Sequence, residues 1–367
     1  MLSLEYPPTR LIRQPMLAEK LGQPLRLGII GCGRVFERFY LPAISRTPAL
    51  SLVAACDTDR GRLAWAEHRS SAPALFGTPA DLFRYQGLEA VLVLTPPASH
   101  ALNVIQALQA GLHVLVEKPM ALNPAEAGHM AETARLVRRH LQVGFSRRFR
   151  EPYQALRRAL QRKQQPTIRR VHFELSFPTM SWKAESDFLG KESHGGGVLD
   201  DVLSHQVDLV CWLMGDWPRR VRCEVNVASG QVRAELEIGG ASVHCESAHS
   251  RYAERLQIEL TDNSVLEASG SHLREGRPGL ERWRRARALV LDRISLINDR
   301  LLRRPNVSLR SFENQLHDFS GAIRGETSQG ASADDGVRTV EVVDACRESV
   351  RQAGTWQAIK TTAGPAA

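Results

Sequence analysis

The chain has 367 residues, 43% of them hydrophobic and 24% charged, which is typical of a soluble globular protein with two domains. It contains no apolar run near the roughly 18 to 20 residues that a membrane span needs, and residues 1–15 lack the apolar core of a secretory signal. The net charge of +8 comes largely from an arginine-rich segment, residues 274–304; without an aromatic–basic RNA-binding signature or a recognition-helix pattern, we expect no nucleic-acid partner.

Strands alternate with helices through the first half of the chain, after an N-terminal extension of residues 1–24. This alternation predicts an α/β domain with a doubly wound, mostly parallel sheet over residues 25–148. Ligands of such sheets bind beyond the carboxyl ends of the strands. The patterns predict strands at 25–30, 50–56, 90–94, 113–116 and 141–145, and helices from about 34 and over 60–68, 99–110 and 124–140.

The stretch Leu25–Gly33 reads L-R-L-G-I-I-G-C-G, an apolar run that ends in two glycines one residue apart. Gly31 allows a tight turn from strand to helix, and Gly33 lets the backbone approach a diphosphate. The free N–H groups at the start of the helix, at Arg34 and Val35, would hold that diphosphate. Two such glycines also occur by chance, so the prediction of a dinucleotide site depends on the motifs that follow.

Asp57 ends the second predicted strand. A carboxylate there can accept hydrogen bonds from both hydroxyls of an adenosine ribose and repels a 2′-phosphate, which favours NAD over NADP. An ordinary turn aspartate is the alternative. Arg60 lies nearby and could compensate a 2′-phosphate, so NADP is not excluded.

The third predicted strand ends in a stiff turn that carries Thr95, Pro96 and Pro97, followed by Ser99 and His100. The prolines end the strand, and the next helix can begin at Ser99. The functional interpretation is a rigid turn beside a nicotinamide. A mere strand terminator is the alternative.

The fourth predicted strand ends in Glu117, Lys118 and Pro119. A lysine fixed just past a buried strand projects into the cleft, where it can donate to a substrate hydroxyl and stabilise a developing alkoxide. A surface lysine is the alternative.

After about residue 150 the pattern changes to one of an α+β domain, residues 149–367, with a large, open, mostly antiparallel sheet. Gly239-Gly240 and Asp262-Asn263 are hairpin turn signals between its strands. Residues 178–197 are irregular and include Trp182, which could stack on a sugar face. The patterns predict strands at 169–177, 219–227, 232–238, 241–248, 256–260 and 265–268, and helices at 152–162, 198–214, 312–324 and 334–352.

Asp201 and His205 stand four residues apart on one of these helices, so both face the same way, and Asp208 adjoins them. A carboxylate beside an imidazole fixes its tautomer and raises its basicity, which suits a general base. A surface i,i+4 pair is the alternative. The glycines at 195–197 favour function because they permit close approach of the backbone to a ligand.

The segment 280–302 carries apolar residues near one helical seam, with arginines around it. An amphipathic helix packed on its own domain or on a sister subunit is the simpler interpretation. A basic helix on a membrane surface or an acidic partner is the alternative.

The ordered motifs resemble the glucose–fructose oxidoreductase / inositol dehydrogenase / rhizopine catabolism (Gfo/Idh/MocA) family. The resemblance runs from about residue 26 to 359 and rests on motifs listed here in chain order: G-I-I-G-C-G followed by Leu41-Pro42-Ala43, Thr95-Pro96-Pro97 with His100, Glu117-Lys118-Pro119, V-G-F-S-R-R-F at 143–149, and G-G-G-V-L-D-D-V-L-S-H-Q-V-D at 195–208. It implies NAD(P)-dependent hydride transfer to or from a secondary alcohol of a sugar, cyclitol or nucleotide sugar. It also implies a C-terminal helix that packs back near the Rossmann domain, and a homodimer or homotetramer formed through the C-terminal sheet.

The resemblance assigns roles to three residues. Lys118 would hold the substrate hydroxyl and relay a proton, His205 would be the general base, and Asp201, rather than Asp200, would be its partner. Phe36 departs from the family pattern because a small residue is expected there for close helix–strand packing, so the helix sits away or Phe36 points out of the contact. Leu203 replaces a glycine and is expected to crowd the helix face of Asp201 and His205.

Three functions remain open at this level. The leading one is the sugar or cyclitol dehydrogenase. The others are NAD-dependent glycoside hydrolysis or elimination with a retained cofactor, and a non-catalytic NAD-binding regulator or scaffold. Arg148 could contact an anionic substrate group or brace the domain junction, and no metal ion is expected. The six scattered cysteines without a C-x-x-C pair predict free, mostly buried thiols and a cytoplasmic protein.

Overall fold

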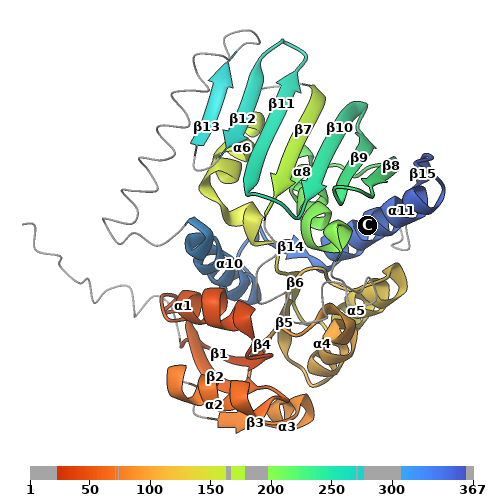
Figure 1. Cartoon of the computed structure of the whole chain (residues 1–367). Helices are drawn as coiled ribbons and strands as arrows, with labels where there is room; N and C mark the ends of the chain where they lie inside the picture. Colours follow the sequence, from red (N-terminus) through yellow and green to blue (C-terminus); the bar gives the residue numbers. More distant parts are fainter. Residues whose placement is uncertain are drawn as a thin grey trace, which may run out of the picture.

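The computed structural model describes residues 23–70, 72, 74–162, 167–177, 197–269, 272–276 and 307–360. Expectations for residues 1–22, for Trp182 and for the arginine-rich segment from 277 onward lie outside the described residues. Figure 1 shows an N-terminal α/β part and, above it, a large twisted sheet. The segments near the C-terminus lie between the two.

The N-terminal sheet is mostly parallel, as predicted. Its strand order is β14-β6-β5-β4-β1-β2-β3, and among its pairings only that of β14 with β6 is antiparallel. The central strands are buried along nearly their whole length because helices cover both faces of the sheet. The bounds are β1 Leu25–Ile30, β2 Leu50–Cys56, β3 Ala74–Phe76, β4 Ala90–Val93, β5 His113–Val116, β6 Leu141–Val143 and β14 Ala331–Ser332.

Local signals explain where the helices of this sheet begin. Asp59, Thr78 and Asn123 accept backbone N–H groups at the starts of α2, α3 and α5. Helical spacing located α2, α4 and α5, whereas the short α3 and the three-residue strand β3 carried no periodic signal and were missed. The bounds are α1 Leu41–Ile44, α2 Arg60–Arg69, α3 Pro79–Phe83, α4 His100–Gln109 and α5 Pro124–Leu136.

The helical segment after the glycine turn contains a π-helical turn, which is wider than the α-helical turn that the sequence predicts. A π-helical turn, Phe36–Tyr40, precedes α1, and Phe36 and Tyr40 are both fully buried in it. Phe36 packs in the core with Leu27 and Ile29, and its ring meets Trp65 edge-on at 6.2 Å between ring centroids. The large side chain is therefore accommodated in the core beside the widened turn.

The C-terminal sheet is open and mostly antiparallel, as predicted. Its strand order is β13-β12-β11-β7-β10-β9-β8-β15, and only β7 and β10 pair in parallel. Buried and less buried residues alternate along β9, β10 and β11, so one face of the sheet carries the core. The bounds are β7 Ile168–Ser176, β8 Arg220–Asn226, β9 Gln231–Ile238, β10 Ala241–Ala248, β11 Ala253–Leu260, β12 Val265–Ser269, β13 His272–Gly276 and β15 Gln357–Ala358.

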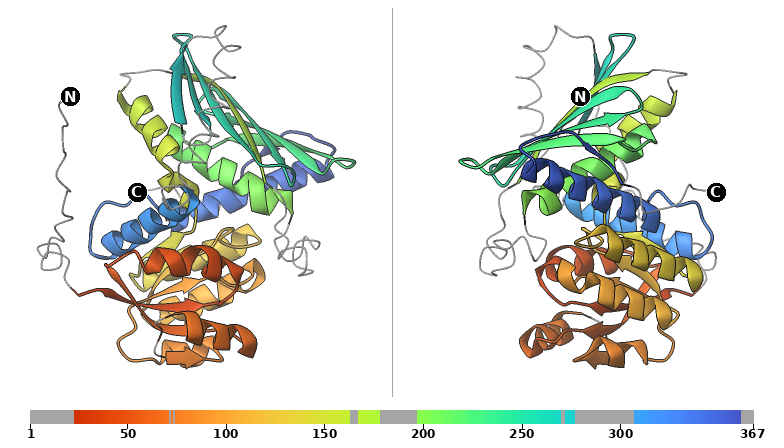
Figure 2. Two further views of the ribbon diagram at one scale, coloured as in Figure 1. Left: turned by 60° about the vertical axis from the view of Figure 1, so that its left-hand side comes forward. Right: turned by 90° about the vertical axis from the view of Figure 1, so that its right-hand side faces the viewer.

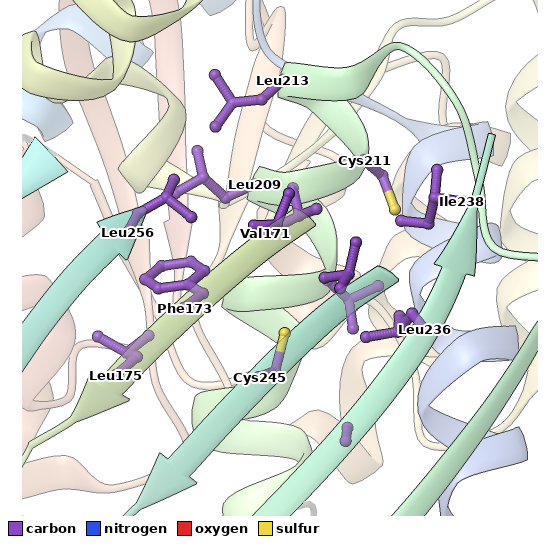
Figure 3. Packing of buried hydrophobic residues seen from close by; sticks show 14 of the residues in the cluster. Val171, Phe173, Leu175, Leu209, Cys211, Leu213, Leu236, Ile238, Cys245 and Leu256 are labelled. Carbon is purple, nitrogen blue, oxygen red and sulfur yellow. The ribbon is translucent and has the colours of Figure 1, made fainter. Parts of the chain in front are cut away.

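Helices cover the apolar face of this sheet (Figure 2). Figure 3 shows Leu209 and Leu213 of α8 packed toward Val171, Phe173 and Leu256 of the strands. A π-helical turn, Leu199–Leu203, leads into α8, and Leu203 is fully buried in this core. The helix bounds are α6 Glu151–Arg162 and α8 Ser204–Met214.

The last part of the chain returns to the N-terminal domain. Leu316 and Phe319 of α10 (Val307–Ile323) belong to the same core as Leu27 of β1, and β14 adds an edge strand beside β6. Helix α11 (Ala333–Arg351) packs against both α5 and β8. All six cysteines are free and buried, as predicted. Among the described helices, none has the length and apolar character of a transmembrane span.

Candidate active site

The turn after β1 requires glycine at its first position. Gly31 has a φ of +100°, and a Cβ there would lie 2.9 Å from the carbonyl carbon and oxygen of Leu94. Gly33 differs, because the nearest atom to an added Cβ is a guanidinium nitrogen of Arg62 at 3.5 Å. Arg34 and Val35 begin the helical stretch. The turn thus has the backbone form and the free helix N-terminus that a dinucleotide diphosphate needs.

Asp57 lies beside this turn and holds it in place. Its Oδ2 accepts the N–H of Cys32 at 2.7 Å, and its Oδ1 accepts the N–H of Asp59 at 2.9 Å. Each carboxylate oxygen has a further lone pair, so both can still accept from ribose hydroxyls. Arg60 and Arg62 are exposed, and Arg62, rather than Arg60, lies against the glycine turn.

His100 connects two loops. Its Nδ1 lies 2.9 Å from the Pro119 oxygen and its Nε2 lies 2.7 Å from the Thr95 oxygen. The ring is fully buried, and this burial lowers its pKa below the usual value. Pro96 is exposed and Pro97 is buried in the same turn. The position of His100 fits a residue that fixes the Thr95 turn to the lysine loop, whereas the exposed Pro96 is free to meet a ligand.

Glu117 is held by a residue that the sequence did not indicate. The hydroxyl of Tyr40 donates to its Oε1 at 2.6 Å, and the N–H of Lys118 donates to its Oε2 at 3.0 Å. Tyr40 also accepts a hydrogen bond from Gln315 of α10. Because Tyr40 lies in the π-helical turn, ordinary helical spacing gave no indication that it would reach the lysine loop.

Lys118 and Asp201 meet at the centre of the site. The Lys118 Nζ donates to Oδ1 of Asp201 at 2.6 Å and to its backbone oxygen at 3.0 Å. The other carboxylate oxygen, Oδ2, lies 3.1 Å from Nε2 of His249. His249 follows β10, and nothing in the sequence linked it to the lysine motif. Asp201 therefore connects a lysine of the first domain to a histidine of the second.

The surroundings of His205 differ from those expected for an imidazole hydrogen-bonded to Asp201. Its Nδ1 is buried and has no hydrogen-bond partner among the described residues. Burial lowers its pKa well below the usual value, and the nearby charges of Lys118 and Arg147 act in the same direction. Asp201 directs its two carboxylate oxygens at Lys118 and His249, and its negative charge acts on His205 by opposing the lowering of the pKa. Leu203 does not crowd the site, because its side chain lies in the core.

Arg148 and Asp208 pair with each other away from these groups. The Arg148 Nη2 donates to Oδ1 of Asp208 at 2.6 Å, and its Nη1 donates to Asp335 at 3.2 Å. Both members of the pair are almost fully buried. Asp208, which was expected to adjoin Asp201 and His205, uses both carboxylate oxygens to accept hydrogen bonds from Arg148. Of the two interpretations of Arg148, its contacts fit the brace between domains.

A second cluster of charged side chains is centred on Glu254. Glu254 accepts hydrogen bonds from Arg147, Arg150 and the hydroxyl of Tyr153. These partners hold the pKa of Glu254 far below its usual range against the opposing effect of burial. The Arg147 guanidinium lies 5.8 Å from the ring centroid of Phe177, whose ring is 6.2 Å from that of His249. This cluster joins residues 147–153 to Glu254 of β11, more than 100 residues later in the chain, so no local motif could reveal it.

Two family models match the chain in succession. The model described as "Oxidoreductase family, NAD-binding Rossmann fold" matches residues 25–145, and that described as "GFO/IDH/MocA C-terminal domain" matches residues 153–264. The chain belongs to the GFO/IDH/MocA oxidoreductase family. The resemblance drawn from the motifs is thereby confirmed, and the chain is an oxidoreductase with an NAD-binding Rossmann domain.

Named relatives agree with this assignment. The chain is 28% identical over 344 residues to an inositol 2-dehydrogenase from Leifsonia xyli, covering 89% of this chain and 92% of the relative. It is 28% identical over 204 residues to a D-glucoside 3-dehydrogenase from Escherichia coli, covering 54% of this chain and 57% of the relative. The WlbA dehydrogenase of Bordetella pertussis, solved with NADH and UDP-GlcNAcA, shares the fold at a TM-score of 0.75 and 20% identity, covering 92% of this chain and 99% of that one.

Proposed function

We propose that this oxidoreductase transfers a hydride between a nicotinamide cofactor and a secondary alcohol or ketone of a sugar, cyclitol or nucleotide sugar. The observation that carries the proposal is the 2.6 Å contact between Lys118 and Asp201, beside His205. Lys118 lies just past the carboxyl end of β5, and in the sheet only β4 separates β5 from β1, the strand that leads into the glycine turn. Ligands of parallel sheets bind at that end. The names of the relatives, which act on inositol and on a glucoside, support a polyhydroxylated substrate.

The residues of the site have separate roles in proton transfer. Lys118 donates a hydrogen bond to the reacting hydroxyl and stabilises the negative charge that develops on its oxygen. Asp201 keeps the Lys118 side chain oriented through their 2.6 Å contact. His205, neutral because its pKa is lowered, accepts the hydroxyl proton. The bound nicotinamide supplies the hydride acceptor or donor at its C4 carbon.

His249 is a positioning residue in this proposal. It binds Oδ2 of Asp201 while Lys118 binds Oδ1, so the carboxylate is fixed from both sides. A carboxylate anchored at two oxygens has a single orientation, and catalytic geometry is sensitive to shifts of about 1 Å. His249 thus sets the position of Lys118 without itself accepting the substrate proton.

The cofactor is NAD in this proposal. Asp57 presents a buried carboxylate at the position of the ribose hydroxyls, and its charge disfavours a 2′-phosphate. Arg60 and Arg62 are exposed cations at the same edge and reduce that discrimination. We therefore expect binding of both cofactors with a preference for NAD.

Assembly and location are part of the same proposal. The open face of the C-terminal sheet carries cross-strand ion pairs, among them Arg222–Glu235 and Arg255–Glu267. Alternating opposite charges on one face are self-complementary, which suits a homodimer or homotetramer formed through this sheet. Six free, buried cysteines suit a reducing compartment, so we place the protein in the cytoplasm.

The decisive experiment is a screen of cyclitols, sugars and nucleotide sugars against NAD⁺ and NADP⁺, followed by the absorbance of the reduced nicotinamide. Reduction with at least one polyol, at a rate that falls by roughly 10²-fold or more in a Lys118→Met variant, supports the proposal. Turnover with no net change in the redox state of a retained cofactor would select glycoside hydrolysis or elimination instead. Failure to bind either cofactor would overturn the dehydrogenase.

A further inference from the structure

Tyr40 lies where three distant segments of the chain meet. It ends the π-helical turn Phe36–Tyr40, and its side chain is fully buried. Its hydroxyl donates to Oε1 of Glu117 at 2.6 Å and accepts a hydrogen bond from Nε2 of Gln315 at 3.2 Å. Its ring meets the ring of Phe312 edge-on, at 5.0 Å between the centroids. One side chain therefore joins the helical segment after the glycine turn to the lysine loop, residues 117–119, and to α10.

The direction of these two hydrogen bonds follows from the chemistry of the groups. An amide NH₂ group is only a donor, so the hydroxyl oxygen of Tyr40 accepts from Gln315 and its single O–H is directed to Glu117. Burial raises the pKa of Tyr40 well above its usual value, and the charge of Glu117 acts in the same direction. The hydroxyl therefore keeps its proton at neutral and mildly alkaline pH, and Tyr40 is a permanent donor to the carboxylate.

The carboxylate of Glu117 is also held from two other sides. Its Oε2 accepts the backbone N–H of Lys118 at 3.0 Å. On the side of β6, a Cβ added to Gly144 would lie 3.1 Å from Oε1 of Glu117 and 3.2 Å from its Cα, so the carboxylate lies close against the backbone there. An acceptor confined in this way orients the main chain at Lys118, and Tyr40 holds its other oxygen.

The helical segment that carries Tyr40 begins at the proposed cofactor site. Arg34 and Val35 begin it beside the glycine turn, and Tyr40 follows Arg34 by six residues. This separation is less than two helical turns. A diphosphate bound at the N-terminus of so short a segment restrains Tyr40 as well.

We propose that Tyr40 is a positioning residue, which couples cofactor binding to the placement of Lys118 through Glu117. The dinucleotide restrains the helical segment, Tyr40 holds the carboxylate of Glu117, and the carboxylate orients Lys118, whose Nζ contacts Asp201. The effect on the reaction rests on the hydride-transfer function proposed above for Lys118. The coupling itself is measurable without turnover.

Amide hydrogen exchange of the full chain, measured in peptides that cover residues 113–121, tests the coupling. We expect saturating NAD⁺ to slow exchange there in the wild type. Tyr40→Phe keeps the ring and loses only the hydroxyl, and it should lose most of this protection while NAD⁺ still binds. With a polyol that the wild type oxidises, Tyr40→Phe should lower kcat by about tenfold, the scale of a hydrogen bond to a charged group, and leave the KM of the polyol nearly unchanged.

Tyr153→Phe is the matched control. Its hydroxyl is also fully buried and donates to a carboxylate, that of Glu254, so the variant loses an equivalent hydrogen bond outside the lysine loop. We expect it to keep the NAD⁺-dependent protection of residues 113–121. Tyr40→Phe should also have no further effect in a Glu117→Ala background, because the hydrogen bond it removes is already absent there.

Several results would overturn the coupling. They are unchanged protection and kcat in Tyr40→Phe, an equal loss of protection in Tyr153→Phe, fully additive losses in the double variant, and no slowing of exchange in the wild type when NAD⁺ binds. If Tyr40→Phe does not fold, Glu117→Ala takes its place, and full NAD⁺-dependent protection in that variant overturns the coupling. A wild type that oxidises no polyol would overturn the dehydrogenase, and the exchange data would still decide the role of Tyr40.

Discussion

Lys118 and Asp201 stand 83 residues apart in the chain, yet the lysine Nζ lies 2.6 Å from the aspartate Oδ1. Lys118 follows β5 of the Rossmann sheet, and Asp201 lies in the π-helical turn that leads into α8 of the other domain. Both side chains are mostly buried, at 14% and 5% exposure. A buried ion pair across the two domains makes the proposed chemistry depend on how the domains are placed.

Replacement of Lys118 tests the centre of the site. We expect Lys118→Met to lower kcat/KM by roughly 10²- to 10⁴-fold, because the variant loses the donor to the reacting oxygen. NAD⁺ affinity, measured by calorimetry, should change little, since the glycine turn and Asp57 are untouched. Lys118→Arg is the control that keeps the charge. Full activity in Lys118→Met would favour a regulator or scaffold over an enzyme.

The role of His205 is tested by its replacement and by the dependence of kcat/KM on pH. We expect His205→Ala to lower turnover by roughly 10²-fold or more, the scale of a general base. Because the pKa of His205 is lowered, the neutral, proton-accepting form persists below the ordinary value of about 6.5. The acid limb of the kcat/KM profile should therefore fall below that pH and disappear in His205→Ala. An unchanged rate and profile would remove His205 from the mechanism.

His249 is predicted to position Asp201. We expect His249→Ala to lower kcat by about tenfold, because Asp201 loses the partner at Oδ2 and the Lys118 ammonium is less well placed. The pH profile should shift as well, which a purely structural defect would not cause. His249→Gln retains a donor and should recover much of the rate. Equal rates in His249→Ala and the wild type would contradict the role.

Arg148 and Asp208 are predicted to act on stability. Burial raises the pKa of Asp208 to about 6, and Arg148 opposes this rise by favouring the charged form. Arg148→Met leaves that carboxyl group buried without its cation, and we expect the free energy of unfolding to fall by about 3–5 kcal/mol. Denaturant unfolding measures the change. The double variant Arg148→Met/Asp208→Leu should regain a large part of it, and a strictly additive loss would argue against a coupled pair.

Asp57 sets the cofactor preference in our proposal. We expect Asp57→Ala to weaken NAD⁺ binding by about tenfold and to narrow the ratio of NAD⁺ to NADP⁺ affinity, because the ribose acceptor and the charge that repels a 2′-phosphate are both lost. Fluorescence titration of each cofactor measures the ratio. Asp59→Ala, which removes the cap of α2 and leaves Asp57 in place, is the control.

Periodic segments were predictable from local sequence, and short or widened ones were not. The strands at 113–116 and 241–248 have the predicted bounds because their apolar patterns are bounded by turn residues. The strands β3, β13, β14 and β15 were missed, since they are short and depend on neighbours supplied by the fold. The two π-helical turns were missed because ordinary helical spacing does not describe them.

The sequence by itself determined the two-domain α/β and α+β architecture, the glycine turn, and the family to which Lys118, Asp201 and His205 point. These features depend on contiguous residues, whose hydrophobic period and motif spacing can be recognised in the sequence. The tertiary structure decided which groups touch. It joined Asp201 to Lys118 and His249, and it paired Asp208 with Arg148. Such contacts join distant segments, and their geometry follows from the packing of whole elements rather than from local sequence.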